Sequence, residues 1–569
     1  MNELYPVYTL KNECRDCYRC VRECYVKAIR IKEDSASVIG DKCIACGACV
    51  RACPSGAKRV RNDVERVKNL IKAKNRVIVS LAPSWSGMFD YTPAAMVSLF
   101  KKLGFEGVSE TALGAQEVSV KTAQILKNGE KELYISSACP SAVDYIRLYK
   151  PEFTRNIVPI ASPAVTHAKM LKTLYGGDVC VVFAGPCIAK KNEAQKRPEL
   201  ISAALTFEEL KLWINEEISD MSFLSVSDGA DFIPKTACEG ALYPIEGGMN
   251  DTIKRAAPLD GVQLISLSSL LSLENALKDY KPSGKKIFLE ALACVGGCVN
   301  GPCRAVEKSG ICVISDILSK VKFRKYTPQN PQVVVNENYV SNHEERKFYS
   351  LSEITQAMKK IGKHAQEDEL NCGGCGYASC RDLAAALISG DAEASMCVSY
   401  MRKKAMRKAD AMFRRMPAAI VMVDSNLRVL EANDAFMRMF CEGKDDYEIF
   451  SSRPDGLAGA AIDKIVNFYE IFKQALELGQ DVCKERLCVK NKLYDITAFT
   501  IEDNEIAGAI ITDVTLSEMN REKIAQKARD VINKNVTTVQ EIACLLGEHM
   551  VETELILNSI AKDYDKDVR

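Results

Sequence analysis

The sequence lacks several features that would place it in a common functional class. Its 569 residues carry 76 Lys and Arg against 75 Asp and Glu, a net charge of +1. No basic surplus therefore favours binding to nucleic acid or to an anionic membrane surface. The longest apolar runs, such as residues 76–83, are much shorter than the roughly 18 residues that a membrane-spanning helix needs. We expect neither nucleic acid nor a membrane as a partner.

The first residues also lack a secretory signal, because no basic start is followed by an apolar run. We therefore expect a cytoplasmic protein, in which disulfides are rare and the 24 cysteines point to metal sites. Histidine is scarce: the chain has four, and none precedes His167. At about 150 residues per domain, the length predicts three or four domains.

Eight cysteines near the N-terminus form two runs with the spacing C-x2-C-x2-C-x3-C. This doubled run is typical of a ferredoxin with two [4Fe-4S] clusters, in which the fourth cysteine of each run binds the other cluster. Zinc and disulfides are the alternatives, and the lack of histidine here disfavours a mixed Cys/His zinc site. The predicted ligands are Cys14, Cys17, Cys20 and Cys53, called the first set, and Cys43, Cys46, Cys49 and Cys24, called the second set.

The middle of the chain alternates short apolar runs with helical patterns, which indicates an α/β domain with a largely parallel sheet. Each run ends at a turn with chemically useful residues, and open α/β sheets bind ligands at the carboxyl ends of their strands. The predicted strands are 77–81, 133–135, 179–183 and 286–289, followed in turn by Pro83 and Ser84, by Cys139, by Cys187 with Lys190 and Glu193, and by Glu290 with Cys294 and Cys298.

These cysteine motifs together resemble the catalytic domain of [FeFe]-hydrogenases over residues 71–320. The resemblance implies an H-cluster, in which a [4Fe-4S] cluster shares one cysteine with a [2Fe] subsite that carries CO, CN and an azadithiolate bridge. It also implies [FeFe]-hydrogenase maturases as partners. By this resemblance Cys139, Cys187 and Cys294 are terminal ligands and Cys298 is the bridging ligand.

The resemblance gives further residues a place around the two irons. Lys190 would donate a charge-assisted hydrogen bond to a cyanide, whereas an ordinary surface lysine is the alternative. Glycine permits a close approach of backbone to a ligand. The residues expected to line the pocket are Pro83, Ser84, Ser162, Pro163, Gly247 and Gly248.

The chain departs from the family pattern at Ala138, where the standard enzymes carry a cysteine that relays protons. Alanine carries no proton, so we expect slow turnover, and this substitution resembles the sensory branch of the family. Gly185 and Leu292 replace methionines that usually pack over the subsite, which changes its surroundings. Protons would then need another route through nearby carboxylates, although each could equally be a structural carboxylate paired with a base. The candidates are Glu193, Glu246 and Glu290.

A third set of cysteines follows a polar connector at 321–366. Cys372, Cys375, Cys380 and Cys397, the third set, have the spacing C-x2-C-x4-C-x16-C. This resembles a small four-cysteine iron–sulfur domain of redox proteins, here spanning 367–410. Four thiolates also suit zinc, but we favour a third accessory [4Fe-4S] cluster because the neighbours are redox domains. His167 and the remaining eight cysteines are expected to be structural.

The C-terminal part contains no metal motif. Residues 411–516 resemble a PAS sensor domain, with a strand pair before Asn433 and a final strand at 505–515; a small α+β dimerisation module is the alternative. Apolar residues then recur at helical spacing over 517–569, which predicts an amphipathic signalling or dimerisation helix. The chain shows no kinase, phosphatase or DNA-binding motif, so we expect a homodimer that signals to an output partner in trans.

The expected fold is multidomain, with α/β and α+β parts: ferredoxin-like (1–70), hydrogenase H-cluster domain (71–320), connector, four-cysteine domain, PAS-like domain and helix. The expected function is reversible cleavage of H2 into two protons and two electrons at low turnover, with electrons passed to a ferredoxin-like partner and a signal sent through the PAS domain. A non-catalytic iron–sulfur electron carrier or redox switch is the alternative, and a high-flux fermentative hydrogenase is disfavoured by Ala138.

Overall fold

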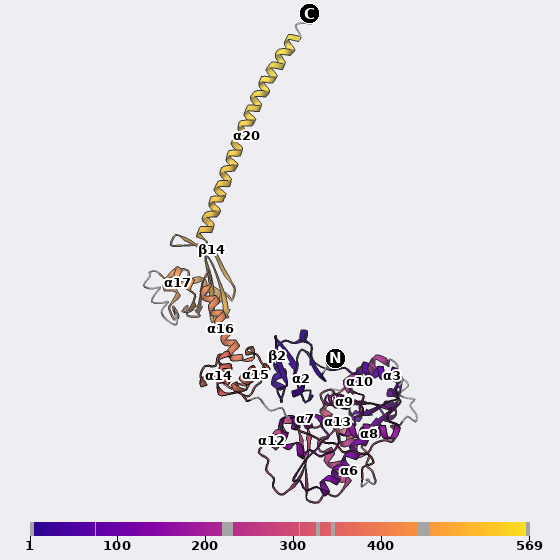
Figure 1. Cartoon of the computed structure of the whole chain (residues 1–569). Coiled ribbons are helices and arrows are strands. Elements are labelled where there is room, and N and C mark those ends of the chain that lie inside the picture. The colour runs from indigo at the N-terminus through magenta and orange to yellow at the C-terminus, as the bar shows by residue number, and fades with distance from the viewer. Residues whose placement is uncertain are drawn as a thin grey trace. The chain divides into compact units, whose positions relative to one another are not determined.

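The computed structural model describes residues 5–73, 75–218, 231–305, 308–325, 330–342, 348–441 and 456–564 (Figure 1). The chain is a mixed α/β protein, as predicted, and divides into two compact units, Met1–Met401 and Arg402–Arg569. Within the described ranges, no helix is long and apolar enough to span a lipid bilayer.

The N-terminal region is built from two similar halves. Two short helices, α1 (Arg19–Glu23) and α2 (Ala48–Ala52), each follow a residue with a left-handed backbone and end at the fourth cysteine of a run. This repeat places the two cysteine runs in equivalent local structures. The strands pair antiparallel as β1 (Val7–Thr9) with β4 (Lys58–Val60) and β2 (Ile29–Lys32) with β3 (Ser35–Val38).

The middle region contains two parallel sheets where the sequence predicted one, and this prediction is corrected. A run of apolar residues reveals a buried strand, but its hydrogen-bonding partner depends on contacts far away in the chain. One sheet has the order β6-β5-β8-β9, with β5 Val77–Leu81, β6 Gly107–Glu110, β8 Cys180–Gly185 and β9 Ala203–Thr206. The other has the order β10-β11-β7, with β7 Leu133–Ile135, β10 Val262–Ser268 and β11 Lys286–Leu292.

Helices cover these sheets, and several begin after a serine or threonine whose side chain accepts a backbone N–H, as an N-cap does. Ser162 caps α8 in this way, and Thr206 with Glu209 forms a capping box on α10. The helices are α3 Val64–Lys72, α4 Trp85–Met88, α5 Pro93–Lys102, α6 Ala112–Asn128, α7 Pro140–Tyr149, α8 Pro163–Tyr175, α9 Ala189–Lys196, α10 Phe207–Glu217, α11 Gly248–Ala256, α12 Leu270–Leu277 and α13 Gly310–Lys320.

The segment predicted as a connector is partly built into this region. The backbone N–H of Ala161 donates to the carbonyl of Val335 at 2.7 Å, and the hydroxyl of Tyr339 donates to the carbonyl of Ile160 at 2.9 Å. Polarity marks a segment as exposed, but it does not exclude backbone docking of this kind. The helices that follow are α14 Leu351–Lys360, α15 Cys380–Ile388 and α16 Val398–Arg415.

The second unit contains a five-stranded antiparallel sheet and one long helix. Asn433 is buried and accepts hydrogen bonds from the backbone N–H groups of Ile420 and Phe436, both at 2.9 Å, which ties the first strand to the helix after it. The sheet order is β13-β12-β16-β15-β14, with β12 Ala419–Asp424, β13 Val429–Ala432, β14 Val482–Val489, β15 Lys492–Glu502 and β16 Ile506–Asp513. The helices are α17 Asp434–Phe440, α19 Glu470–Leu478 and α20 Thr515–Tyr564.

The helix α20 is the predicted amphipathic segment (Figure 1). Its side chains from 519 to 560 are all exposed in the single chain. Its apolar side chains therefore stay largely uncovered within the described part of this chain.

Candidate metal centre

Four cysteines from the ends of three strands line a single cavity. Cys139 precedes α7, Cys187 lies between β8 and α9, and Cys294 follows β11, while Cys298 begins a short 3-10 helix. These are the four residues that the resemblance assigned to an H-cluster. None of the 24 cysteines forms a disulfide, so the cavity cysteines are available as metal ligands.

The electrostatics of these thiols fit a cationic metal group. Burial raises the pKa of Cys187 to about 11, and it also raises the pKa values of Cys294 and Cys298. The cysteines add to this effect because each would repel the others as a thiolate. Thiolates crowded in this way suit iron ions, whose positive charge compensates them.

The cavity wall is largely apolar, and three of the predicted pocket residues belong to it. Pro83, Ser84 and Pro163 line the cavity, as do Ala138 and Leu292. Gly185 lies next to it: a Cβ there would come within 2.7 Å of the Phe183 ring. Phe183, itself a lining residue, therefore takes the space that a side chain at position 185 would need.

Gly247 and Gly248 are not among the residues that line this cavity. Gly247 has a left-handed backbone with φ of 86°, and a Cβ on Gly248 would meet the carbonyl oxygen of Leu242 at 1.9 Å. Their glycine character is thus explained by the tight turn into α11. The prediction that they line the two-iron pocket does not match this geometry.

Lys190 reaches the cavity from α9 and is only 9% exposed. Its ammonium donates to Ser162 Oγ at 3.0 Å and to Glu193 Oε2 at 2.6 Å. An ammonium carries three N–H donors, so these two contacts orient the group and leave it capacity for a ligand in the cavity. Ser162 does not line the cavity itself but holds Lys190, and Glu193 is the paired carboxylate of Lys190.

Glu290 and Glu246 each accept a hydrogen bond from a serine of the strand β10, and these two serines lie on the same face of that strand. Glu290 is 1% exposed and accepts a hydrogen bond from Ser266 Oγ at 2.9 Å; burial raises its pKa to about 7. Glu246 is exposed and accepts from Ser268 Oγ at 2.5 Å. The buried carboxylate of Glu290 and the exposed carboxylate of Glu246 therefore bind two serines that are two positions apart on β10.

The accessory cysteines of each predicted set lie near one another in the structure. Cys20 interacts electrostatically with Cys14, Cys17 and Cys53, and burial raises its pKa to about 11. Cys49 interacts with the other members of the second set, Cys43, Cys46 and Cys24. All members of the third set line one small cavity. Cys46 also lines the cavity of the four H-cluster cysteines, so the second set lies beside them.

Three family models match the chain. Residues 75–302 match the iron only hydrogenase large subunit, C-terminal domain, residues 13–66 match a 4Fe-4S dicluster domain, and residues 368–399 match an Fe–S cluster model. These matches support the [FeFe]-hydrogenase family. The matched ranges lie where the sequence predicted hydrogenase-type and iron–sulfur domains.

Two curated hydrogenases are similar to part of this chain. Iron hydrogenase 1 of Clostridium pasteurianum is 26% identical over 298 residues, which cover 42% of this chain and 52% of that protein. The periplasmic [Fe] hydrogenase large subunit of Nitratidesulfovibrio vulgaris is 27% identical over 264 residues, which cover 37% of this chain and 62% of that protein. The chain thus matches less than two thirds of the length of either relative.

Solved structures give more distant likenesses. An [FeFe]-hydrogenase variant from Chlamydomonas reinhardtii has 16% identity and a TM-score of 0.39, covering 50% of this chain and 100% of that one. The PAS domain of nitrogen regulation protein NR(II) from Vibrio parahaemolyticus has 14% identity and a TM-score of 0.14, covering 18% of this chain and 96% of that one.

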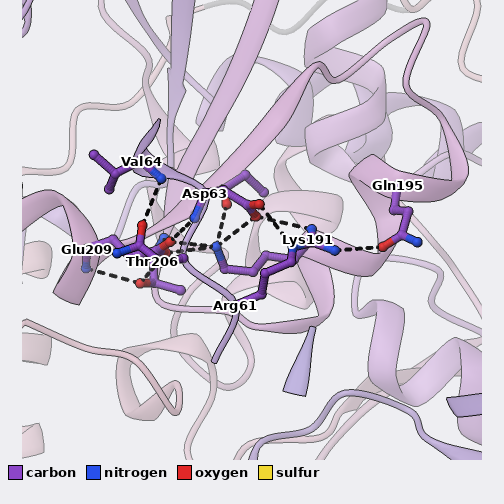
Figure 2. A network of polar contacts seen from close by, with 9 residues as sticks. Arg61, Asp63, Val64, Lys191, Gln195, Thr206 and Glu209 are labelled. Carbon is purple, nitrogen blue, oxygen red and sulfur yellow. Dashed lines mark hydrogen bonds and ion pairs between the residues drawn. The ribbon is translucent and has the colours of Figure 1, made fainter. Parts of the chain in front are cut away.

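A buried ionic network, which the sequence did not reveal, secures the hydrogenase-like domain to the N-terminal region (Figure 2). Lys191 is 1% exposed and binds Asp63 at 3.0 Å, Glu209 at 2.8 Å and the carbonyl of Ala204 at 2.8 Å. Arg61 pairs with Asp63 at 3.0 Å. The network fixes α9, the helix that carries Lys190. No local motif marks Lys191, whose partners lie 128 and 18 residues away.

His167 is also structural in this geometry, as predicted. It is fully buried between Ser80 Oγ at 2.7 Å and Ser109 Oγ at 2.9 Å, and burial lowers its pKa to about 3. The ring is therefore neutral and fixed at both nitrogens.

Proposed function

We propose that the protein is a sensory [FeFe]-hydrogenase that reversibly cleaves H2 into two protons and two electrons at low turnover. The observation that carries this proposal is one buried cavity lined by all four H-cluster cysteines, by Lys190 and by Ala138. When bound, the H-cluster would supply the redox chemistry of H2 cleavage. The protein supplies ligands, orientation and a water-poor environment.

Each side chain has a defined part in this proposal. Cys139, Cys187 and Cys294 would hold the [4Fe-4S] part, and Cys298 would bridge to the [2Fe] subsite. Lys190, oriented by Ser162 and Glu193, would bind a cyanide. Apolar walls strengthen such electrostatic contacts because they exclude water.

The electron route and the partners follow from the arrangement of the cysteine sets. We propose that the second set exchanges electrons with the H-cluster, since Cys46 lines the same cavity. A ferredoxin-like protein would take electrons from the accessory clusters, and [FeFe]-hydrogenase maturases would insert the [2Fe] subsite. We place this chemistry in the cytoplasm because of the cysteine content.

The second unit would report the redox state of the first. We propose that residues 411–516 are a PAS domain, that α20 pairs with its counterpart in a homodimer, and that an output partner binds in trans. The exposed apolar residues of α20 support this pairing, because helices with such stripes commonly associate.

Infrared spectroscopy tests the central proposal. After loading with the two-iron cofactor, the protein is expected to show CO and CN stretching bands that change under H2. Absence of such bands in protein whose [4Fe-4S] clusters are assembled would exclude an H-cluster in this cavity.

A non-catalytic iron–sulfur electron carrier or redox switch is the second candidate. Ala138 favours it, because a methyl group in the cavity wall relays no proton. The two candidates differ in a simple assay: the hydrogenase oxidises H2 with a dye acceptor, whereas the carrier does not.

We expect Glu290→Gln to lower H2 turnover by about 10²-fold, the lower range for loss of a general acid or base. A carboxyl with a pKa of about 7 is protonated below neutral pH and ionised above it, so it can both take and give a proton near pH 7. The variant should lose the corresponding limb of the pH–rate profile while its infrared bands stay unchanged. Glu246→Gln, which changes the exposed carboxylate, should lower turnover less. If both variants turn over H2 at the rate of the parent, protons reach the cavity through water instead.

The raised pKa of Glu290 also predicts how the stability of the protein depends on pH. This pKa is raised in the folded state, so folding is favoured while Glu290 is protonated, and this contribution is lost as pH rises through about 7. We therefore expect the stability of Glu290→Gln, measured relative to the parent at the same pH, to be higher at pH 8 than at pH 5. Thermal denaturation of both proteins at the two pH values measures this difference.

Ala138→Cys is expected to raise H2 turnover by about 10²-fold, because it restores a titratable group to the cavity wall. Ala138→Ser is the matched control of similar size, and its hydroxyl should raise turnover less. An unchanged rate in the cysteine variant, with normal infrared bands, would show that proton delivery is not limited at this position.

A further inference from the structure

The third cysteine set lies against the N-terminal region through a specific polar contact. Asp391 is 6% exposed and accepts hydrogen bonds from Lys42 Nζ at 2.7 Å and Arg30 Nε at 3.0 Å. The carbonyl of Asp391 accepts the backbone N–H of Ile31 at 3.2 Å. Burial opposes ionisation, but the Lys42 and Arg30 hydrogen bonds hold the pKa of Asp391 below its usual value. Asp391 therefore fixes residues near the third set to β2.

The loop that carries Cys375 packs directly on α1. A Cβ on Gly376 would lie 3.0 Å from Val21 Cγ1 and 3.1 Å from the backbone nitrogen of Arg22, so the backbone of the loop lies close to the helix. The guanidinium of Arg22 donates to the carbonyl of Gly374 at 3.3 Å and to that of Cys17 at 3.1 Å. Cysteines of all three accessory sets contribute to one shared core.

Lys27 lies at this junction. Its ammonium donates to the carbonyls of Val21 at 3.1 Å and Arg22 at 3.4 Å, at the carboxyl end of α1 where the Cys375 loop packs. Burial lowers its pKa, while Cys24 of the second set and Cys375 of the third set both raise it. One half-buried cation thus lies three residues after Cys24 of the second set, at the helix end on which the Cys375 loop of the third set packs.

We propose that Lys27 is a positioning residue shared by the second and third sets, and that its charge sets the reduction potentials of the groups bound at both. This rests on the proposed iron–sulfur assignment of the third set. An added electron at either set is stabilised by a cation at short range, and partial burial strengthens that interaction. The contacts of Asp391 and Gly376 hold both sets close to the same ammonium.

Redox titration followed by electron paramagnetic resonance tests this inference, on full-length protein with its [4Fe-4S] clusters but without the two-iron cofactor. Lys27→Gln should shift the potentials of both sets downward, because the reduced forms lose a cation. Lys27→Arg should restore them. Lys32→Gln removes a lysine that is 71% exposed and should leave both potentials unchanged. A shift at one set alone, or at neither, would overturn the inference.

Metal analysis separates this inference from the proposed function. Zinc in the third set would overturn the inference together with the iron–sulfur assignment of that set. Iron in every set, with reduction potentials that are unchanged in Lys27→Gln, would overturn the inference alone. If Lys27→Gln does not assemble its clusters, Asp391→Asn provides the second measurement. Loosened docking should shift the potential of the third set and leave the first set unchanged; an unshifted third set would refute the shared site.

Discussion

Cys298→Ser should abolish H2 oxidation with a dye acceptor and remove the CO and CN infrared bands. The thiolate is the form of cysteine that binds metal, and a serine hydroxyl does not replace it as the bridge between two metal groups. Cys298 is partly buried and lines the cavity together with the other three cysteines. The electron paramagnetic resonance signals of the first and second sets should persist, since these cysteines are untouched.

Cys303→Ser is the matched control for this substitution. Cys303 is 1% exposed and lies outside the cavity lining. We expect this variant to keep the infrared bands and H2 oxidation of the parent. Retained bands and activity in Cys298→Ser would instead show that the bridging assignment is wrong.

Lys191→Met should destabilise the first unit by about 3–5 kcal/mol, the cost of removing one partner from a buried ion pair. Lys191 compensates the buried carboxylates of Asp63 and Glu209, and Arg61 also pairs with Asp63. Without the lysine, an uncompensated negative charge stays inside the protein.

Denaturant unfolding followed by tryptophan fluorescence measures this effect. The chain has two tryptophans, Trp85 and Trp213, and both belong to the core of the hydrogenase-like domain. Lys196→Met is the control on the same helix: its side chain is 47% exposed in a pair with Asp144, so its loss should cost no more than about 1 kcal/mol. Equal midpoints for the two variants would contradict a stabilising role for the buried network.

The sequence by itself predicted the four cysteine sets and the type of several local elements. Short spacings such as C-x2-C leave the chain little freedom, so Cys14, Cys17 and Cys20 must lie close together in any fold that binds a cluster. Apolar runs and capping residues are local signals as well, which is why β5 at Val77–Leu81 and the helix α20 could be predicted.

Tertiary structure alone decided how these parts meet. The division of the parallel strands into two sheets and the burial of Glu290, while Glu246 stays exposed, depend on which distant segment covers each residue. The same holds for Lys191, and for Asp391, whose partners Arg30 and Lys42 lie 361 and 349 residues away. The sequence alone does not distinguish a solvated charged residue from a buried one. The role of a buried charge depends on a partner that only folding brings within hydrogen-bond distance.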